Sequence, residues 1–306
     1  ERENSKVRIV LGNPSCDLDS AVCALVQGYL EREILSSTTG KNDGLDFVVL
    51  PVMNVSRREF RVKTEVVFFL KRCQVSENLL TFRDEVNLGA LHSSGRLELV
   101  LVDHHTLTGE DTALADCVIE VLDHRPHDPE WPWTGRRLTL ERVGSCATLV
   151  ARNLLKLEVD ILKPTLALLL LGPILIDTAN FSKEADRATA LDHEMANELG
   201  KICCMNELHR TQLFDEILQA KTDVSGLNSD DLLIRDLKVV NGVPISGFPI
   251  LVKEFLQLDG AEEALKAFCS SRSCDACVLV GMKFKDGNMI RDLAVYSPSS
   301  HPLASK

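Results

Sequence analysis

Short apolar runs that alternate with helix-like segments restrict the fold of this sequence more than any other feature. A β-branched run at residues 7–11 is followed by a polar turn and then by helical periodicity through about residue 33. Further runs of strand length lie at residues 47–51, 97–102 and 118–122, with helix-like segments between some of them. Alternation of this kind predicts an α/β fold in which a mostly parallel sheet is flanked by helices.

A polar stretch at residues 182–192 is the best candidate for a domain boundary. After it come a helix-like stretch at residues 205–221 and a second α/β pattern. We therefore expect a first domain over residues 1–190 and a second, smaller α/β domain over residues 195–306. Because the sequence stops soon after a strand-like run, we expect the second domain to continue beyond residue 306.

The charge balance disfavours two kinds of partner. The sequence has 34 lysines and arginines against 45 aspartates and glutamates, which gives a net charge of -11. A surface of this kind does not hold nucleic acid or anionic lipid over a broad area. An anionic substrate would therefore need a local positive centre, such as a bound metal ion.

Ten cysteines, several of them within apolar runs, indicate reduced buried thiols rather than a disulfide framework. Cys274 and Cys277 have CxxC spacing, but no second pair or nearby histidine completes a zinc set. The sequence has no apolar run of about 18 residues that would predict a membrane span, and its first residues do not resemble a signal peptide. We expect a cytoplasmic protein, with the nucleus as a second location.

Acidic and imidazole side chains follow four runs that we predict to be strands, the last of them at residues 173–176. These side chains are Asp17 and Asp19, then Asp103, His104 and His105, then His124 and Arg125, and finally Asp177. Parallel strands end at one edge of the sheet, which is where ligands bind in open α/β folds. A lone strand-end aspartate is more often part of a capped turn, and an aspartate beside Ser20 could cap the helix that follows.

Four such groups at one sheet edge favour a metal site over four separate turns. Clustered carboxylates raise one another's pKa unless a cation neutralises them. Oxygen ligands with a minority of imidazole suit Mn²⁺, Mg²⁺ or Co²⁺. Two such ions about 3.5–4 Å apart are a recurring device for in-line attack at phosphorus. The residues therefore predict a metal-dependent phosphoesterase.

Ordered motifs over nearly the whole chain resemble the DHH phosphoesterase superfamily. The closest likeness is to the prune family, in the branch with a DHHA2-type second domain that also holds family II inorganic pyrophosphatases and exopolyphosphatases. The motifs are Cys-Asp-Leu-Asp-Ser (16–20), Phe-Arg-Asp-Glu (82–85), Leu-Val-Asp-His-His (101–105), Val-Leu-Asp-His-Arg-Pro (121–126), Val-Gly-Ser-Cys-Ala-Thr-Leu-Val (143–150) and Asp-Val-Ser-Gly-Leu (223–227). The resemblance implies an active site in the cleft between two domains.

The same resemblance implies a two-metal site. The implied metal ligands are Asn13, Asp17, Asp19, Asp103, His124 and Asp177. Asp103 and Asp177 correspond to bridging carboxylates, and with His124 they form the expected catalytic set. Asn13 stands where bacterial pyrophosphatases have a metal-binding histidine, so it can offer only an amide oxygen. Two Mn²⁺ or Mg²⁺ ions are the implied cofactors, with Co²⁺ as a further option.

The implied substrate contacts include one departure from the family. The second histidine of the family's Asp-His-His motif is Arg125 here, which can hold a phosphate oxygen but cannot donate its proton near neutral pH. We therefore expect weak activity on pyrophosphate. His104 and His105 would face substrate, or alternatively form a strand-end pair bonded to backbone. Lys238 resembles a lysine that holds the substrate, the alternative being a solvated charge.

The implied function is hydrolysis of terminal phosphoanhydride bonds of short-chain inorganic polyphosphate by two-metal hydroxide attack. Cyclic nucleotide hydrolysis is an alternative that the prune likeness raises. A third reading is a scaffold with weak residual hydrolase activity that binds nucleoside diphosphate kinase. An intact set of clustered carboxylates argues against a fully inactive scaffold. We expect neither nucleic acid nor a membrane as a partner.

Overall fold

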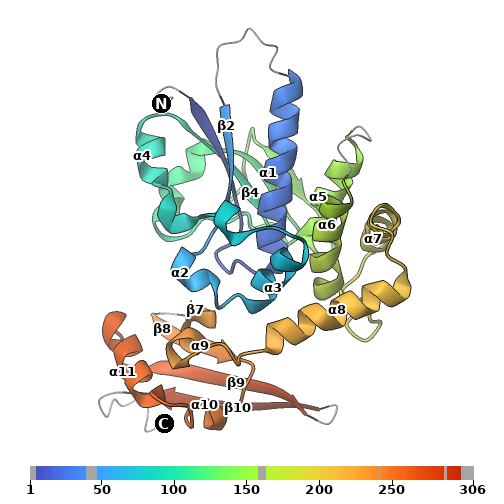
Figure 1. Ribbon diagram of the computed structural model, residues 1–306. Helices are drawn as coiled ribbons and strands as arrows, with labels where there is room; N and C mark the ends of the chain where they lie inside the picture. The colour runs from blue at the N-terminus through green and yellow to red at the C-terminus, as the bar shows by residue number, and fades with distance from the viewer. Residues whose placement is uncertain (1–4, 39–46, 158–162, 241, 286–287, 298–306) are drawn as a thin grey trace. The chain divides into compact units, whose positions relative to one another are not determined.

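A computed structural model describes residues 5–38, 47–157, 163–240, 242–285 and 288–297 (Figure 1). The chain divides into two compact units, Glu1–Arg57 with Glu65–Ala220, and Arg58–Thr64 with Lys221–Lys306. The last residues, 298–306, lie outside the described part. Within the described ranges, no helix is long and apolar enough to cross a membrane.

The first unit is built on a six-stranded sheet with the order β3-β2-β1-β4-β5-β6. Every neighbouring pair of strands is parallel. The strands are β1 (Lys6–Leu11), β2 (Phe47–Met53), β3 (Thr81–Phe82), β4 (Leu97–Val102), β5 (Val118–Asp123) and β6 (Arg137–Leu140). The four runs that predict strands near the start of the sequence are β1, β2, β4 and β5. This confirms the parallel α/β fold.

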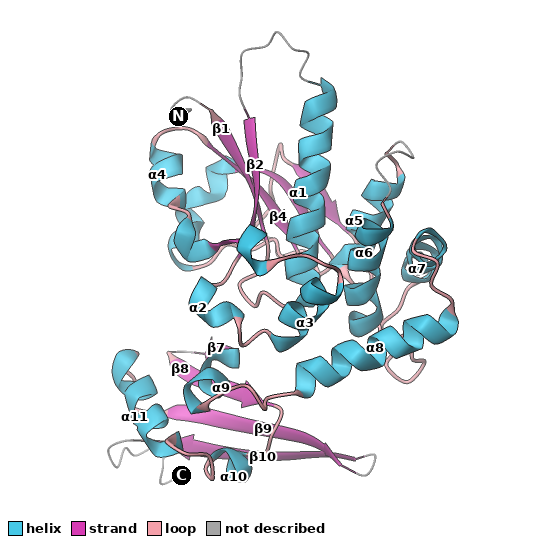
Figure 2. Cartoon of the chain, in the orientation of Figure 1, coloured by secondary structure: helices cyan, strands magenta, loops and turns pink. Residues whose placement is uncertain are grey.

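Helices cover both faces of this sheet (Figures 1 and 2). The helices between residues 18 and 222 are α1 (Leu18–Thr38), α2 (Arg57–Phe60), α3 (Thr64–Arg72), α4 (Leu88–Ser93), α5 (Cys146–Leu155), α6 (Pro164–Asp177), α7 (Ala190–Ile202) and α8 (Glu207–Thr222), with short 3-10 helices η1 (Glu77–Leu79), η2 (Arg83–Glu85) and η3 (Gly109–Cys117). Helices α1 and α5 pack on one face, and α4 and η3 pack on the other.

Strand β1 shows how the sequence assigns its faces. Val7, Ile9 and Leu11 are buried in the apolar cluster that also contains Leu88 of α4. Arg8 points to the opposite face, where its Nη1 lies 2.6 Å from Oε2 of Glu31 on α1. Because successive side chains of a strand point to opposite faces, this alternation fixes which helix covers which side.

The prediction of a strand at residues 173–176 is wrong. Helix α6 runs through this segment to Asp177 and includes Pro173. The apolar residues before and after the proline are buried, among them Leu171 and Leu175. A short buried apolar run carries no periodicity that separates helix from strand, and the proline reads as a helix end although the helix continues. Asp177 therefore reaches the site from the end of a helix.

The second unit contains a smaller, mixed sheet with the order β10-β9-β8-β7, in which β8 and β9 are parallel. Its elements are α9 (Ser229–Arg235), β7 (Asp236–Val240), β8 (Val243–Phe248), α10 (Val252–Phe255), α11 (Ala261–Ser271), β9 (Cys277–Lys285) and β10 (Asn288–Tyr296). A second, smaller α/β unit is thus present, as the sequence predicts.

The boundary between the units lies later than the sequence suggests. It falls after Ala220, whereas the polarity of residues 182–192 places it near residue 190. Helix α7 packs against α5 and α6 and so belongs to the first unit. Part of the polar stretch is a buried anchor, because Asp192 of α7 accepts a hydrogen bond of 2.5 Å from the hydroxyl of Thr148 on α5. Polarity alone does not reveal such an internal contact.

A largely buried glutamate, Glu120 on β5, makes the stability of the first unit depend on pH. Burial raises the pKa of Glu120 to about 7; Arg137 opposes this rise, and nearby Glu31 adds to it. The folded protein thus holds the Glu120 proton more tightly than the unfolded chain does. The contribution of this proton to the free energy of unfolding is complete below the pKa of Glu120 in the unfolded chain and is lost as pH rises through 7. Glu120→Gln cannot lose a proton. Its free energy of unfolding relative to wild type should therefore be about 2 kcal/mol higher at pH 8 than at pH 5.

Urea unfolding at the two pH values measures this difference. Glu130→Gln, at an exposed position, is the matched control and should show no such change. A difference between Glu120→Gln and wild type that is the same at both pH values would contradict the assignment.

Candidate metal centre

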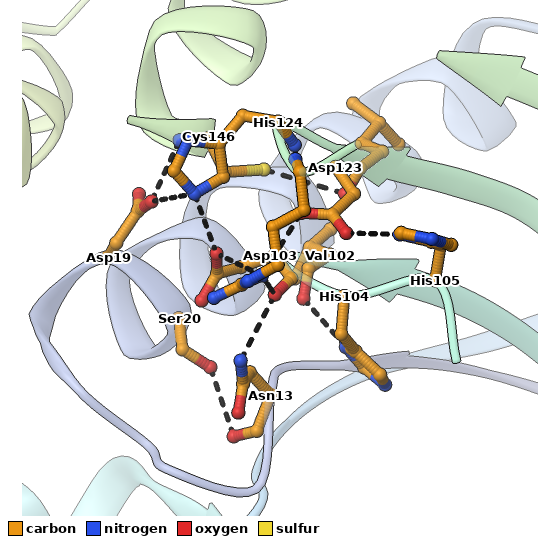
Figure 3. A network of polar contacts seen from close by, with 12 residues as sticks. Asn13, Asp19, Ser20, Val102, Asp103, His104, His105, Asp123, His124 and Cys146 are labelled. Atoms are coloured by element: carbon orange, nitrogen blue, oxygen red, sulfur yellow. Dashed lines mark hydrogen bonds and ion pairs between the residues drawn. The ribbon is translucent and has the colours of Figure 1, made fainter. Parts of the chain in front are cut away.

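The strand order places a ligand site beside β1. Strand β1 lies between β2 and β4, so the connections run in opposite directions on its two sides. In open α/β sheets, ligands bind at such a point, outside the carboxyl ends of the strands. Asn13 follows β1, Asp103 follows β4 and His124 follows β5. Figure 3 shows these side chains converging at this edge, as the sequence predicts.

The loop after β1 is folded tightly onto the start of α1. A Cβ atom on Gly12 would lie 2.4 Å from Oγ and 2.9 Å from the backbone oxygen of Ser20, so only glycine fits. Cys16 has a positive φ of 45° and bends the chain. Oδ1 of Asp17 then accepts a hydrogen bond of 3.1 Å from the Ser20 amide and caps α1. Asp17 is thus the aspartate that caps α1, which is the alternative to a metal ligand that the sequence raises.

Asp19 has a different role, because a second helix holds it. Its carboxylate is buried in the first turn of α1 and accepts the amide N–H groups of Cys146 at 2.7 Å and Ala147 at 2.8 Å. These are the first amides of α5, which have no partner within their own helix. The two hydrogen bonds at the helix N-terminus therefore hold the side chain of Asp19 in a set orientation.

His124 is oriented in the way that metal-binding histidines usually are. Its Nδ1 donates a hydrogen bond of 3.0 Å to the backbone oxygen of Val143, which turns Nε2 toward the carboxylates. Nε2 lies 3.4 Å from Oδ1 of Asp103 and 3.9 Å from Oδ2 of Asp19. Burial alone would lower the pKa of His124, but these two carboxylates raise it to about 9.

Two carboxylates of the cluster lack the donors that buried oxygens require. Within the described residues, Oδ2 of Asp103 and Oδ2 of Asp177 are buried and accept no hydrogen bond. Burial raises the pKa of Asp103 to about 7, with Asp19 adding to the rise. Burial also raises the pKa of Asp177 well above its usual range, again with help from Asp19. Buried carboxylate oxygens without donors are costly unless a cation neutralises them.

The donor set fits a divalent metal ion. Ligand atoms of Asp19, Asp103 and His124 all lie within 4.8 Å of one another. Asp17 and Asp177 add charge beside them, since Asp17 raises the pKa of both Asp103 and Asp177. Carboxylate oxygens with one imidazole match the ligand preferences of Mn²⁺ and Mg²⁺. In the part of the chain that the structure describes, Oδ2 of Asp103 and Oδ2 of Asp177 accept no hydrogen bond and so remain available to a metal ion.

Asn13 and Arg125 brace Asp103 in this structure. The amide nitrogen of Asn13 donates to the backbone oxygen of Asp103 at 3.2 Å, while its Oδ1 accepts the Ser15 amide at 2.8 Å. Nη1 of Arg125 lies 3.0 Å from Oδ1 of both Asp103 and Asp123, and it also donates to the backbone oxygen of Asp103. The Arg125 side chain is 40% exposed, so part of it faces solvent.

The two histidines after β4 differ in what they can contact. His105 donates from Nδ1 to Oδ2 of Asp123 at 2.5 Å and accepts the Asp128 amide at Nε2, 3.0 Å away. Because both ring nitrogens are engaged within the protein, the structure favours the alternative in which His105 positions Asp123 over one in which it binds substrate. Nδ1 of His104 lies 3.0 Å from the backbone oxygen of Val102, and burial lowers the pKa of this ring. Both residues line a pocket of about 390 Å³ that also contains Arg125.

Asp123 is a functional residue that the sequence reading did not single out. It is fully buried and accepts hydrogen bonds from His105, from the backbone amide of His124 at 2.8 Å and from Arg125. It therefore holds the two residues that follow it in position. Its place at the start of the Asp-His-Arg motif is the signal that could have identified it.

The loop before α5 and the first residue of α5 also hold site residues in position. Its Val143 oxygen orients His124, and its Cys146 amide binds Asp19. Asp192 anchors the loop by accepting the Gly144 amide at 2.8 Å.

Lys238, the expected substrate lysine, is exposed on β7 of the second unit.

Comparison with known proteins identifies the second unit and the relatives of the chain. The DHHA2 domain family matches residues 215–306. "Exopolyphosphatase PRUNE1" of Bos taurus is 39% identical over 303 residues, which cover 97% of this chain and 64% of the relative. "Putative exopolyphosphatase" of Schizosaccharomyces pombe is 31% identical and is matched over 94% of this chain and 75% of its own length. The chain spans about 64% of the length of the mammalian relatives that are named exopolyphosphatase.

Archaeal proteins share the fold. "Manganese-dependent inorganic pyrophosphatase" of Methanocaldococcus jannaschii is 28% identical over 241 residues, covering 76% of this chain and 66% of that protein. The crystal structure of a "putative family II inorganic pyrophosphatase" of Methanococcus jannaschii superposes with a TM-score of 0.59 at 22% identity, over 95% of this chain and 88% of that chain.

The parallel sheet with its carboxylate and histidine cluster is followed by a match to the DHHA2 domain family, which places the chain in the class of α/β proteins with a DHHA2 domain. Within that class, the chain belongs to the family of prune proteins and exopolyphosphatases.

Proposed function

We propose that this chain hydrolyses the terminal phosphoanhydride bonds of short-chain inorganic polyphosphate in a divalent-metal-dependent reaction. The observation that carries the proposal is the pair of buried carboxylate oxygens, on Asp103 and Asp177, that accept no hydrogen bond in the described structure. A divalent cation would neutralise both carboxylates and would occupy the position that a hydrogen-bond donor otherwise takes. The relatives named exopolyphosphatase supply the substrate class.

Two Mn²⁺ or Mg²⁺ ions are the proposed cofactors, with Co²⁺ as a further option; a related archaeal pyrophosphatase is named as manganese-dependent. The proposed ligands are Asp17, Asp19, Asp103, His124 and Asp177, with the amide oxygen of Asn13 as a weaker one. When bound, the ions would activate water for attack at phosphorus and neutralise negative charge.

The chain's own residues would hold the substrate and the ligands. The amides of Cys146 and Ala147 fix Asp19, and the Val143 oxygen keeps Nε2 of His124 directed at the cluster. Arg125 lines the neighbouring pocket with a partly exposed guanidinium, which can pair with a phosphate oxygen. We include Lys238 as a second phosphate contact.

A substrate comparison tests this function. With Mn²⁺ present, tripolyphosphate should release phosphate faster than pyrophosphate, and 3′,5′-cyclic AMP should be hydrolysed more slowly than either. Faster hydrolysis of cyclic AMP would favour the phosphodiesterase alternative. No hydrolysis of any of the three would leave binding of nucleoside diphosphate kinase as the leading function.

Arg125 determines how poorly pyrophosphate is used, because it cannot protonate a leaving group. Arg125→His restores a group that can donate a proton, so the ratio of pyrophosphate to tripolyphosphate turnover should rise by about tenfold. Steady-state rates on both substrates measure the ratio. Arg136→His, at an exposed position outside the site, is the control. An unchanged ratio in Arg125→His would show that Arg125 does not set this preference.

A further inference from the structure

A second group of metal-binding side chains lies apart from the centre described above. Ligand atoms of His92, Asp116 and Cys117 all lie within 4.8 Å of one another. Nε2 of His92 is 3.2 Å from Oδ1 and 3.4 Å from Oδ2 of Asp116. Among the described residues, this group and the cluster of Asp19, Asp103 and His124 are the ones whose geometry suits a metal ion.

The chain topology places this group at the opposite edge of the sheet from the proposed catalytic centre. His92 is in the last turn of α4, which precedes β4, and Asp116 and Cys117 end η3 immediately before β5. The catalytic cluster lies at the other end of the same strands. Six residues of β5 separate Cys117 from His124, a distance of about 20 Å at ~3.3 Å per residue. The two groups therefore cannot share an ion.

The chemistry of the three side chains is that of a zinc-type site. Imidazole, carboxylate and thiolate all bind Zn²⁺, and thiolate selects for softer ions than Mn²⁺ or Mg²⁺. Nitrogen and oxygen ligands about 2.0–2.1 Å from a tetrahedral ion lie roughly 3.3 Å apart. The separation of 3.2 Å between His92 and Asp116 matches that geometry without a rearrangement.

The surroundings give an ion both access and a fixed frame. The side chain of His92 is 33% exposed and that of Asp116 is 72% exposed, so an ion can enter and water can serve as a fourth ligand. Cys117 packs against the apolar cluster that contains Leu114 and Val118, which holds its sulfur in place. Burial raises the pKa of the Cys117 thiol to about 11, so a bound ion would have to displace its proton.

We propose that His92, Asp116 and Cys117 bind one zinc-class transition-metal ion, completed by water, at a site separate from the catalytic centre. The ion would tie the end of α4 to the start of β5. Both segments pack into one apolar cluster through Leu88 and Val118. The site would therefore stabilise the sheet edge rather than take part in hydrolysis. The competing explanation is an ordinary surface ion pair between His92 and Asp116.

Titration with Co²⁺ separates these explanations, because Co²⁺ can take the place of Zn²⁺ in a site of this kind. A Co²⁺ ion that is bonded to a thiolate gives a sulfur-to-metal charge-transfer band in the absorption spectrum. None of the ligands proposed for the catalytic centre is a thiolate, so Co²⁺ bound there does not produce this absorption band. On the full chain, the band should grow to one equivalent of thiolate-bound Co²⁺ and should disappear when Zn²⁺ is added. Cys117→Ser and His92→Ala should abolish the band, and Cys274→Ser, the cysteine control, should retain it.

A second measurement guards against misfolding of the variants. Asp116→Asn changes an exposed side chain and should fold normally, yet it should weaken Co²⁺ binding at this site by about tenfold or more. All variants should keep wild-type phosphate release with Mn²⁺. A missing band in wild type, or a band that survives in Cys117→Ser, would overturn the proposal while leaving the proposed polyphosphatase function untouched.

Discussion

Replacement of Asp103 by asparagine is expected to reduce Mn²⁺-dependent phosphate release from tripolyphosphate by about a thousandfold or more. The reason is that Asp103 places an unpartnered carboxylate oxygen inside the cluster, next to His124 and Asp19. An amide keeps the shape of the side chain but removes the negative charge that a divalent ion needs. The initial rate of phosphate release measures the effect.

The control for this variant is Asp215→Asn, the same change at an exposed position of α8. It should retain the wild-type rate. The Asp103 variant should also keep the wild-type far-UV circular dichroism spectrum, because the left-handed conformation at this position, with a φ of 59°, is accessible to asparagine. A folded Asp103→Asn protein with more than about a tenth of the wild-type rate would contradict the assignment.

Asp123→Ala should lower the free energy of unfolding by about 3 kcal/mol. Asp123 is buried and accepts hydrogen bonds from His105, Arg125 and the backbone amide of His124. Removing the carboxylate leaves these donors without their partner, although the guanidinium of Arg125 keeps its contacts with Asp103. Urea unfolding of the metal-free protein measures the loss.

Asp215→Ala serves as the matched control, and its effect should stay below about 0.5 kcal/mol, since the side chain is exposed. An Asp123→Ala protein as stable as this control would show that Asp123 does not organise the motif. A variant that is destabilised but regains its stability as Asp123→Asn would show that hydrogen bonding, not charge, is what matters at this position.

The sequence predicts the sheet edge well because the relevant signals are local. Apolar runs of five or six residues mark β1, β4 and β5, and the residues at their ends must meet if the strands are parallel. Asp103 and His124 could therefore be brought together without a structure. The carboxylate and imidazole groups at these strand ends also predict a metal ion.

The remaining features depend on contacts between distant segments. Asp19 is held by amides of residues 127 and 128 positions later in the chain, which no local pattern encodes. Asp177 lies at the end of helix α6. The apolar run before it contains a proline, and from sequence alone this run predicts a strand. His105 carries the same chemistry as His104, and only the positions of Asp123 and Asp128 show that its ring is already saturated.

The direct test of a two-metal centre is a calorimetric titration of Mn²⁺ into wild type and Asp177→Asn. We expect two Mn²⁺ ions per chain in wild type and the loss of at least one of them in the variant, because Asp177 contributes a buried oxygen that accepts no hydrogen bond from the described residues. Wild type that binds no Mn²⁺, or a folded Asp177→Asn protein that binds it with unchanged stoichiometry and affinity, would contradict the account.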